Sequence, residues 1–227
     1  MYLPRSRHRW DLSPQEAVRL QKKLAGEIKQ TPLSSKPQIV AGGDVSFSGD
    51  GRQLVAAWVV WDLAEEVVVE TTYAAREVTF PYVLGLLSFR EAPALLAAAK
   101  KLKTEPDAFM FDGQGLAHPR RFGIASHVGL LMDRPTCGCA KSRLCGRHAE
   151  PSPRVGSSTQ LTDDNGVIGR VVRTRDRVKP IYVSVGHRMT LSDAMKLTLR
   201  CRGKYRVPEP TRLAHHLVTK RRKELFG

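Results

Sequence analysis

The sequence has few cysteines, no long apolar run and a shortage of acidic residues. Only four of its 227 residues are cysteine, so we expect no disulfide framework, which suits a reducing compartment. No stretch approaches the roughly 18 consecutive apolar residues that a membrane-spanning helix needs. The polar, basic residues that follow Met1 contain no secretory signal core. These absences exclude a disulfide-stapled miniprotein and predict a soluble, cytoplasmic protein with no membrane partner.

The shortage of acidic residues leaves a strongly basic chain. Lysine and arginine together number 37 against 22 aspartates and glutamates, a net charge of +15. A surface with this excess attracts polyanions, and nucleic acid is the first candidate. The 41% hydrophobic content is enough for a sizeable core in a chain of this length. We find no internal repeat and no interdomain linker, and predict a single, monomeric domain over residues 1–227.

Hydrophobic periodicity predicts an α/β fold in which helices flank a mixed sheet. Strands are expected at residues 38–47, 54–62, 67–74, 108–111, 135–140, 167–174 and 180–185. Helices are expected at residues 13–30, 83–102, 122–132, 191–201 and 211–225. The first three strands are separated only by short turns, which indicates an antiparallel meander.

Residues 146–165 show no periodicity. The segment is polar and contains Pro151, Pro153 and Gly156. Irregular stretches of this length are uncommon inside compact domains and often carry function. We expect a mobile loop here.

Two aspartates stand at positions where a buried strand is predicted. Asp44 lies within an apolar run, where an unpaired carboxylate would cost several kcal/mol. Asp112 ends the apolar run 108–111 and precedes a glycine turn. Either residue could instead be an ordinary turn aspartate, since two glycines precede Asp44.

Glu91 occupies an apolar helical stripe. Glu91 belongs to a series that recurs at steps of three or four residues, with Leu84, Leu87, Leu95, Ala98 and Leu102, so its side chain shares their face. The alternative is a glutamate at the edge of the stripe, paired with a neighbouring arginine. Three acids from two strands and a helix could together bind divalent cations through oxygen ligands. With a basic surface, this predicts a metal-dependent nuclease.

Five blocks of sequence resemble the endonuclease V family, in the family's order. The longest is FDGQGLAHPRRFGIASH (Phe111–His127), which resembles the family signature. The others are GDVSF (Gly43–Phe47), FPYVLGLLSFRE (Phe80–Glu91), AKSRL (Ala140–Leu144) and PEPTRLAH (Pro208–His215). The resemblance spans most of the chain.

This resemblance implies an RNase H-like fold and a DNA-repair activity. The family nicks DNA at the second phosphodiester bond 3′ of a deaminated base, chiefly deoxyinosine, with Mg²⁺ or Mn²⁺ as cofactor. By motif, the metal ligands would be Asp44, Glu91, Asp112 and His215, and Lys141 would stabilise phosphate charge. From the residues alone, His215 could not be preferred over the adjacent His216.

The resemblance also implies a DNA wedge and a lesion pocket. The wedge would be Pro81, Tyr82, Val83 and Leu84, although the family usually has proline where this chain has Leu84. It separates the strands beside a flipped, damaged nucleotide. The pocket would be made of Gly85, Leu87, Gly113, Ile124, Gly138 and Leu144.

Two other functions stay open. One is an endoribonuclease for inosine-containing RNA on the same scaffold, because the response to a 2′-hydroxyl is not readable from sequence. The other is a non-catalytic nucleic-acid-binding protein. The three acids disfavour the second, since a simple binder gains nothing from negative charge beside phosphate.

Overall fold

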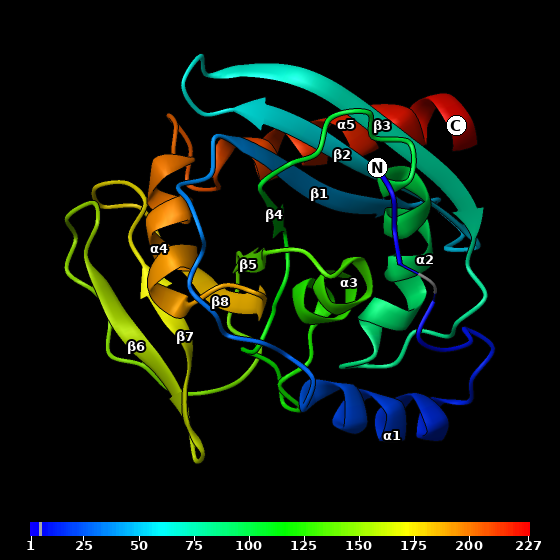
Figure 1. Ribbon diagram of the computed structural model, residues 1–227, viewed down its shortest axis with the longest axis horizontal. Helices are drawn as coiled ribbons and strands as arrows, with labels where there is room; N and C mark the ends of the chain where they lie inside the picture. The colour runs from blue at the N-terminus through cyan, green and yellow to red at the C-terminus, as the bar shows by residue number, and fades with distance from the viewer. Residues whose placement is uncertain (5) are drawn as a thin grey trace.

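The computed structural model describes residues 1–4 and 6–227. Its strands are β1 (Ile39–Phe47), β2 (Gln53–Asp62), β3 (Val67–Glu77), β4 (Ala108–Phe111), β5 (Thr136–Ala140), β6 (Ser158–Asp163), β7 (Gly166–Val172) and β8 (Ile181–His187). Its helices are α1 (Pro14–Ala25), α2 (Leu87–Ala99), α3 (Ile124–Met132), α4 (Leu191–Arg200) and α5 (Glu209–Phe226). Within the described residues, the strands form one mixed sheet in the order β3-β2-β1-β4-β5-β8-β7-β6 (Figure 1).

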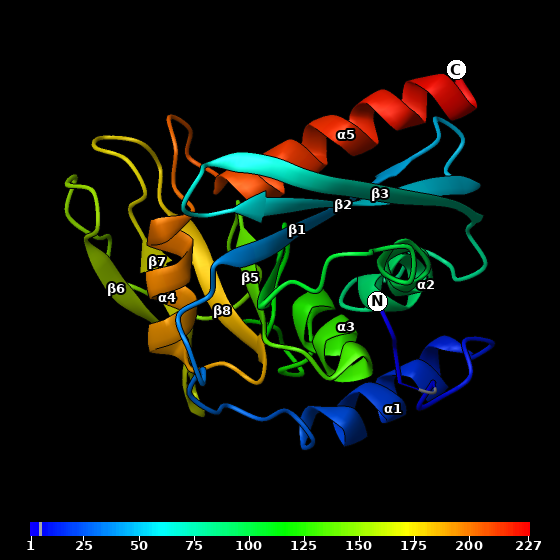
Figure 2. The same ribbon diagram turned by 45° about the horizontal axis from the view of Figure 1, so that its top comes forward.

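The sheet is covered by helices on both faces. The first three strands form the predicted antiparallel meander, and β4 runs parallel to both β1 and β5. Helix α5 crosses one face of β1 and β2, whereas α2 and α3 lie on the other face (Figure 2). The predicted mixed sheet with flanking helices is therefore confirmed. The carboxyl end of β4 lies beside the middle of β1, at Gly43, and α5 contacts both strands.

The two glycines before Asp44 are packing residues rather than part of a turn. A Cβ atom on Gly42 would lie 2.1 Å from the carbonyl carbon of Pro210, at the start of α5. A Cβ atom on Gly43 would lie 2.5 Å from the ring of Trp58, which is fully buried between the sheet and α2. Asp44 itself pairs within β1. The alternative of a turn aspartate at position 44 is therefore wrong.

Two predicted helices are shorter in the structure. Helix α1 ends at Ala25 rather than residue 30, and Gly26 caps it. Helix α2 begins at Leu87 rather than residue 83, because Gly85 has a left-handed φ of 78°. Such a backbone conformation interrupts a right-handed helix. Residues 83–86 consequently form a turn in front of α2.

The segment 146–165 is not irregular throughout. Residues 158–163 form β6, which pairs with β7 in an antiparallel hairpin turning at Asp164 and Asn165. Only Leu161 of this strand is fully buried. A strand held mainly by backbone pairing carries little hydrophobic alternation, which is why the sequence did not reveal it.

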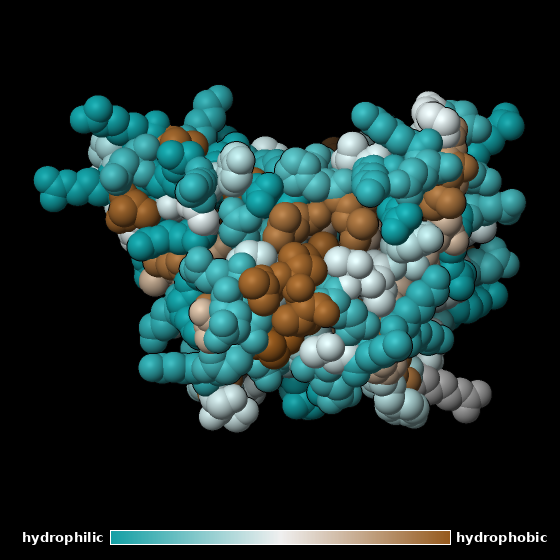
Figure 3. Space-filling model, turned by 90° about the horizontal axis from the view of Figure 1, so that it is seen from above, coloured by the Kyte–Doolittle hydropathy of each residue, from teal (hydrophilic) through white to brown (hydrophobic). Residues whose placement is uncertain are grey.

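Strand β3 forms one edge of the sheet and carries exposed apolar side chains. Val67, Val68 and Val69 are each partly exposed, and β3 runs along the top of Figure 1. Viewed from above, apolar side chains gather at the centre of this face with polar side chains around them (Figure 3). Glu66 and Glu70 flank the three valines. Charges beside an exposed edge strand oppose pairing with other chains.

The described helices include none that combines the length and the apolar character needed to cross a membrane.

Candidate active site

Adjacent parallel strands bring Asp44 and Asp112 together. Asp44 lies in β1, and Asp112 directly follows β4. The backbone N–H of Asp112 donates to the carbonyl oxygen of Gly43 in β1 at 3.3 Å. Both aspartate side chains are only 13% exposed. Two carboxylates from separate segments therefore face the same small volume.

Helix α5 adds a nitrogen ligand to this pair. Nδ1 of His215 lies 2.8 Å from Oδ2 of Asp44. One ligand atom from each of Asp44, Asp112 and His215 can be chosen such that all three lie within 4.8 Å of one another. The absence of a side chain at Gly42 allows α5 to approach β1 closely enough for this contact. The structure thus distinguishes His215 from His216, which lies outside the cluster.

Glu91 faces the same cleft but is not part of this compact group. Burial, followed by the negative charge of Asp44, raises the pKa of Glu91 to about 8, and the positive charge of Arg90 opposes the shift. Burial and then the charge of Asp112 also raise the pKa of Asp44. Burial is thus the main cause of both shifts, and the neighbouring carboxylates add to it.

Lys141 provides positive charge beside the acidic cluster. Its Nζ forms an ion pair with Oδ2 of Asp112, and its side chain is 43% exposed. Lysine is a common phosphate-binding residue because its ammonium group acts as a point charge. Asp112 therefore pairs with Lys141, whose ammonium group can face substrate, and also belongs to the cluster with Asp44 and His215.

The donor set fits a divalent cation with oxygen-rich coordination. Two carboxylates and an imidazole converge within a few ångströms. Mg²⁺ and Mn²⁺ favour carboxylate oxygens, and Mn²⁺ also accepts imidazole nitrogen. Asp44, Asp112 and His215 would hold such an ion, with Glu91 beside them.

A cleft of about 390 Å³ joins this cluster to the predicted wedge. Tyr82 and Leu84 stand at its rim with 72% and 75% of their surfaces exposed. Val83 also lines it, whereas Pro81 is exposed in the same turn. The guanidinium of Arg90 lies 5.9 Å from the ring centroid of Tyr82. An aromatic side chain thus stands exposed beside the acidic cluster.

Five of the six predicted pocket residues line this cleft: Gly85, Leu87, Gly113, Ile124 and Leu144. Gly138 does not. A Cβ atom there would lie 2.3 Å from the carbonyl oxygen of Gly113, so Gly138 allows β5 to pack behind the turn that follows Asp112. Gly138 therefore lies behind the turn at position 113 in this structure, and its role in a lesion pocket stays a prediction.

Sequence reasoning missed several residues that line the cleft. They come from α1, from the start of α2, from the Phe111–His127 block, and from the end of β5 and the segment after it: Gln21, Ser88, Gln114, His118, Phe122, Gly123, Ala140, Ser142 and Arg143. Ala140, Ser142 and Arg143 flank Lys141, so adjacency could have indicated them. Gln21 carries no motif signal, because it lies outside every block that resembles the family.

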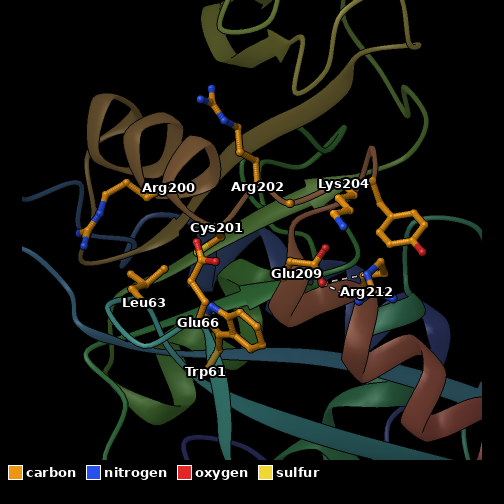
Figure 4. A pocket seen from close by; sticks show the side chains of 11 residues that line it. Trp61, Leu63, Glu66, Arg200, Cys201, Arg202, Lys204, Glu209 and Arg212 are labelled. Atoms are coloured by element: carbon orange, nitrogen blue, oxygen red, sulfur yellow. Dashed lines mark hydrogen bonds and ion pairs between the residues drawn. The ribbon is translucent and has the colours of Figure 1, made fainter.

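A second hollow of about 270 Å³ lies at the opposite side of α5. Figure 4 shows Arg200 and Arg202 pointing away from Trp61, and Glu209 paired with Arg212. Among the described residues, the one group of acidic and histidine side chains close enough together to hold a metal ion lies at the cleft and not in this hollow. The candidate active site is therefore the cleft with the Asp44, Asp112 and His215 cluster.

Comparisons with known proteins identify the family to which this chain is similar. The family profile described as Endonuclease V matches residues 22–216. A curated relative named Endonuclease V, from Methanothrix thermoacetophila, is 48% identical over 217 residues, covering 96% of each chain. The crystal structure of the Endonuclease V from Streptomyces avermitilis superposes with a TM-score of 0.92 at 41% identity, covering 96% of each chain.

A third relative was solved with nucleic acid. Ciona intestinalis Endonuclease V, in complex with a 24mer DNA containing an inosine followed by a ribo-adenosine, is 30% identical with a TM-score of 0.81. The match covers 93% of this chain and 98% of that one. These neighbours confirm the predicted RNase H-like fold and the nuclease class. The chain belongs to the endonuclease V family.

Proposed function

We propose that this protein is a monomeric, cytoplasmic DNA-repair endonuclease that recognises deaminated bases, chiefly deoxyinosine. It hydrolyses the second phosphodiester bond 3′ to the lesion: water adds to phosphorus, the bond to the 3′ oxygen breaks, and a 3′-hydroxyl and a 5′-phosphate remain. The whole chain acts as one domain, in keeping with the single sheet that runs through its described residues.

The observation that carries this proposal is the cluster of Asp44, Asp112 and His215 within 4.8 Å, at one end of a cleft with a wedge at its rim. When bound, Mg²⁺, or Mn²⁺ in its place, polarises water and offsets negative charge during phosphodiester hydrolysis. Asp44, Asp112 and His215 hold the ion, with Glu91 in reach of the same volume. A purely binding protein would have no use for buried carboxylates beside phosphate.

Lys141 acts on the phosphate. Its ion pair with Asp112 places the ammonium group at the cluster while part of the side chain faces solvent. Negative charge grows on the phosphoryl oxygens as water adds, so a cation fixed in advance stabilises the transition state more than the ground state. The same ion pair keeps the ammonium from swinging away before substrate arrives.

The exposed rim reads the lesion. Tyr82 can stack against a base, and unstacking costs least at a mispaired or damaged base. The cleft behind it is lined in part by Gly85 and Gly113, which have no side chain and so can present backbone groups to a base. Hypoxanthine presents a carbonyl and an N1–H where adenine presents an amino group and an acceptor, so fixed backbone groups can distinguish the two.

A second candidate is cleavage of inosine-containing RNA. The Ciona intestinalis relative was crystallised with a ribonucleotide directly after the inosine. A site that tolerates a 2′-hydroxyl at that position would accept RNA.

The test is cleavage of an end-labelled duplex carrying one deoxyinosine, with Mg²⁺ or EDTA. An undamaged duplex and a matched inosine RNA serve as comparison substrates. We expect a Mg²⁺-dependent nick one nucleotide beyond the lesion on its 3′ side. Preference for RNA would favour the second candidate, and absence of cleavage of all three substrates would refute both.

A further inference from the structure

Gln21 is a buried amide in a position that suits leucine. It lies on α1 between Ala17 and Leu24, the other two buried residues of that helix, and has no exposed surface. Burying an amide without partners costs roughly 1–3 kcal/mol. A glutamine here therefore requires its hydrogen bonds to be satisfied by specific neighbours.

Two of those neighbours, Gly85 and Phe122, line the cleft, and the third is Arg120. Nε2 of Gln21 donates to the carbonyl oxygens of Gly85, at 3.0 Å, and Phe122, at 2.7 Å. Its Oε1 accepts a hydrogen bond from Nε of Arg120. One side chain of α1 thus connects the turn behind the wedge to the segment that enters α3.

The carbonyl oxygen of Gly85 is held by two further donors. Nη2 of Arg120 donates to it at 2.7 Å. Nδ1 of His118 accepts from the backbone N–H of Arg120 at 3.1 Å, so the proton lies on Nε2, which donates to Gly85 at 3.1 Å. A carbonyl with three donors, on a residue of left-handed φ, is strongly constrained.

The inner side of the turn is held by packing, because Leu86 is buried and Val83 contacts the hydrophobic cluster that contains Leu86 and Phe89. Tyr82 and Leu84 are largely exposed, and one backbone hydrogen bond closes the turn, from Leu86 to Val83 at 2.9 Å. A Cβ atom on Gly85 would lie 2.5 Å from Nη2 of Arg120, so the approach depends on glycine. The packing of Leu86 holds the inner side of the turn, and the hydrogen bonds at Gly85 fix the backbone between Leu86 and the exposed Tyr82 and Leu84.

We infer that Gln21 is a positioning residue for lesion recognition: it fixes the Gly85 turn, and with it the wedge, relative to the Asp44 and Asp112 cluster. This inference rests on the proposed function. Gln21 touches neither the cluster nor Lys141, so its loss should weaken selective binding of inosine DNA while the chemical step at saturation is kept. A buried residue of merely structural importance would instead lower stability and affect all substrates alike.

The test compares Gln21→Leu with Gln15→Leu, the same substitution at an exposed position of α1. Binding is measured in Ca²⁺ with inosine and undamaged duplexes, and single-turnover cleavage at saturating enzyme in Mg²⁺. For Gln21→Leu we expect the Kd for the inosine duplex to rise about tenfold, or roughly 1.4 kcal/mol. The Kd for undamaged DNA and the saturating rate should stay within about threefold of wild type.

A readout independent of activity completes the test. Amide hydrogen exchange in residues 82–87 should become about tenfold faster in Gln21→Leu and stay unchanged in Gln15→Leu. Should Gln21→Leu fail to fold, Arg120→Met removes two contacts of the same network from a partly exposed side chain and should give the same pattern.

Unchanged exchange at residues 82–87, or equal loss of binding to both duplexes, would overturn the inference. If wild type showed no preference for inosine, the proposed function would fail instead, and the exchange comparison would still decide whether Gln21 positions the turn.

Discussion

His118 makes the fold sensitive to acid. Its ring is buried behind the Gly85 turn, and Nδ1 accepts the backbone N–H of Arg120. Burial first, and then the positive charge of Arg120, lower the pKa of His118 from 6.5 to about 4, against the opposing effect of the bond to Gly85. The folded protein thus keeps His118 neutral where the unfolded chain protonates it.

The size of the effect follows from proton linkage. Below pH 6.5 the unfolded chain binds a proton that folded His118 does not, so stability falls as the pH falls. Each pH unit in this range costs about 1.4 kcal/mol. Between pH 7 and 5, His118 alone should lower the free energy of unfolding by about 2 kcal/mol. For a chain of this length, that lowers Tm by roughly 4–8 °C.

Urea denaturation at pH 5, 6, 7 and 8 measures this contribution. His118→Gln keeps a side-chain N–H for the Gly85 carbonyl but cannot titrate, so between pH 7 and 5 it should lose about 2 kcal/mol less stability than wild type. His216→Gln removes an exposed histidine and is the matched control, with the slope of wild type. If His118→Gln also followed the wild-type slope, the argument that the fold holds this ring neutral would be refuted.

Three substitutions test the remaining parts of the site. Asp112→Ala should lower Mg²⁺-dependent cleavage more than about a hundredfold, which exceeds the usual effect of losing an outer partner of a metal ligand. Binding of inosine DNA in Ca²⁺ should persist in gel shifts. Retained nicking would remove Asp112 from the mechanism. Tyr82→Ala should raise the Kd for inosine DNA about tenfold through lost stacking, and an equal rise for undamaged DNA would contradict a wedge role. Gly42→Ala should destabilise the fold by about 1–3 kcal/mol and lower cleavage. The added Cβ would collide with Pro210 and displace α5, the helix that carries His215. An unchanged thermal melt would show that α5 does not pack as described.

Much of the fold and the main acids could be predicted from the sequence because their signals are local. The meander and most helices follow from apolar periodicity within single segments. Asp44 and Glu91 stand out because a charge interrupts an otherwise apolar pattern. The family resemblance added His215 and Lys141, which periodicity alone could not have selected.

Tertiary structure decided what depends on contacts between distant segments. Strand β6 has a mostly polar sequence, and its pairing with β7 becomes visible only in the fold. The cleft wall joins α1 to the turn at Gly85 through Gln21, across 64 residues of sequence. The position of Gly138 behind Gly113 depends on how closely β5 packs against the next turn. Packing distances and hydrogen bonds between separate elements leave no periodic trace in a single sequence, whereas the side-chain pattern of each element is written along the chain itself.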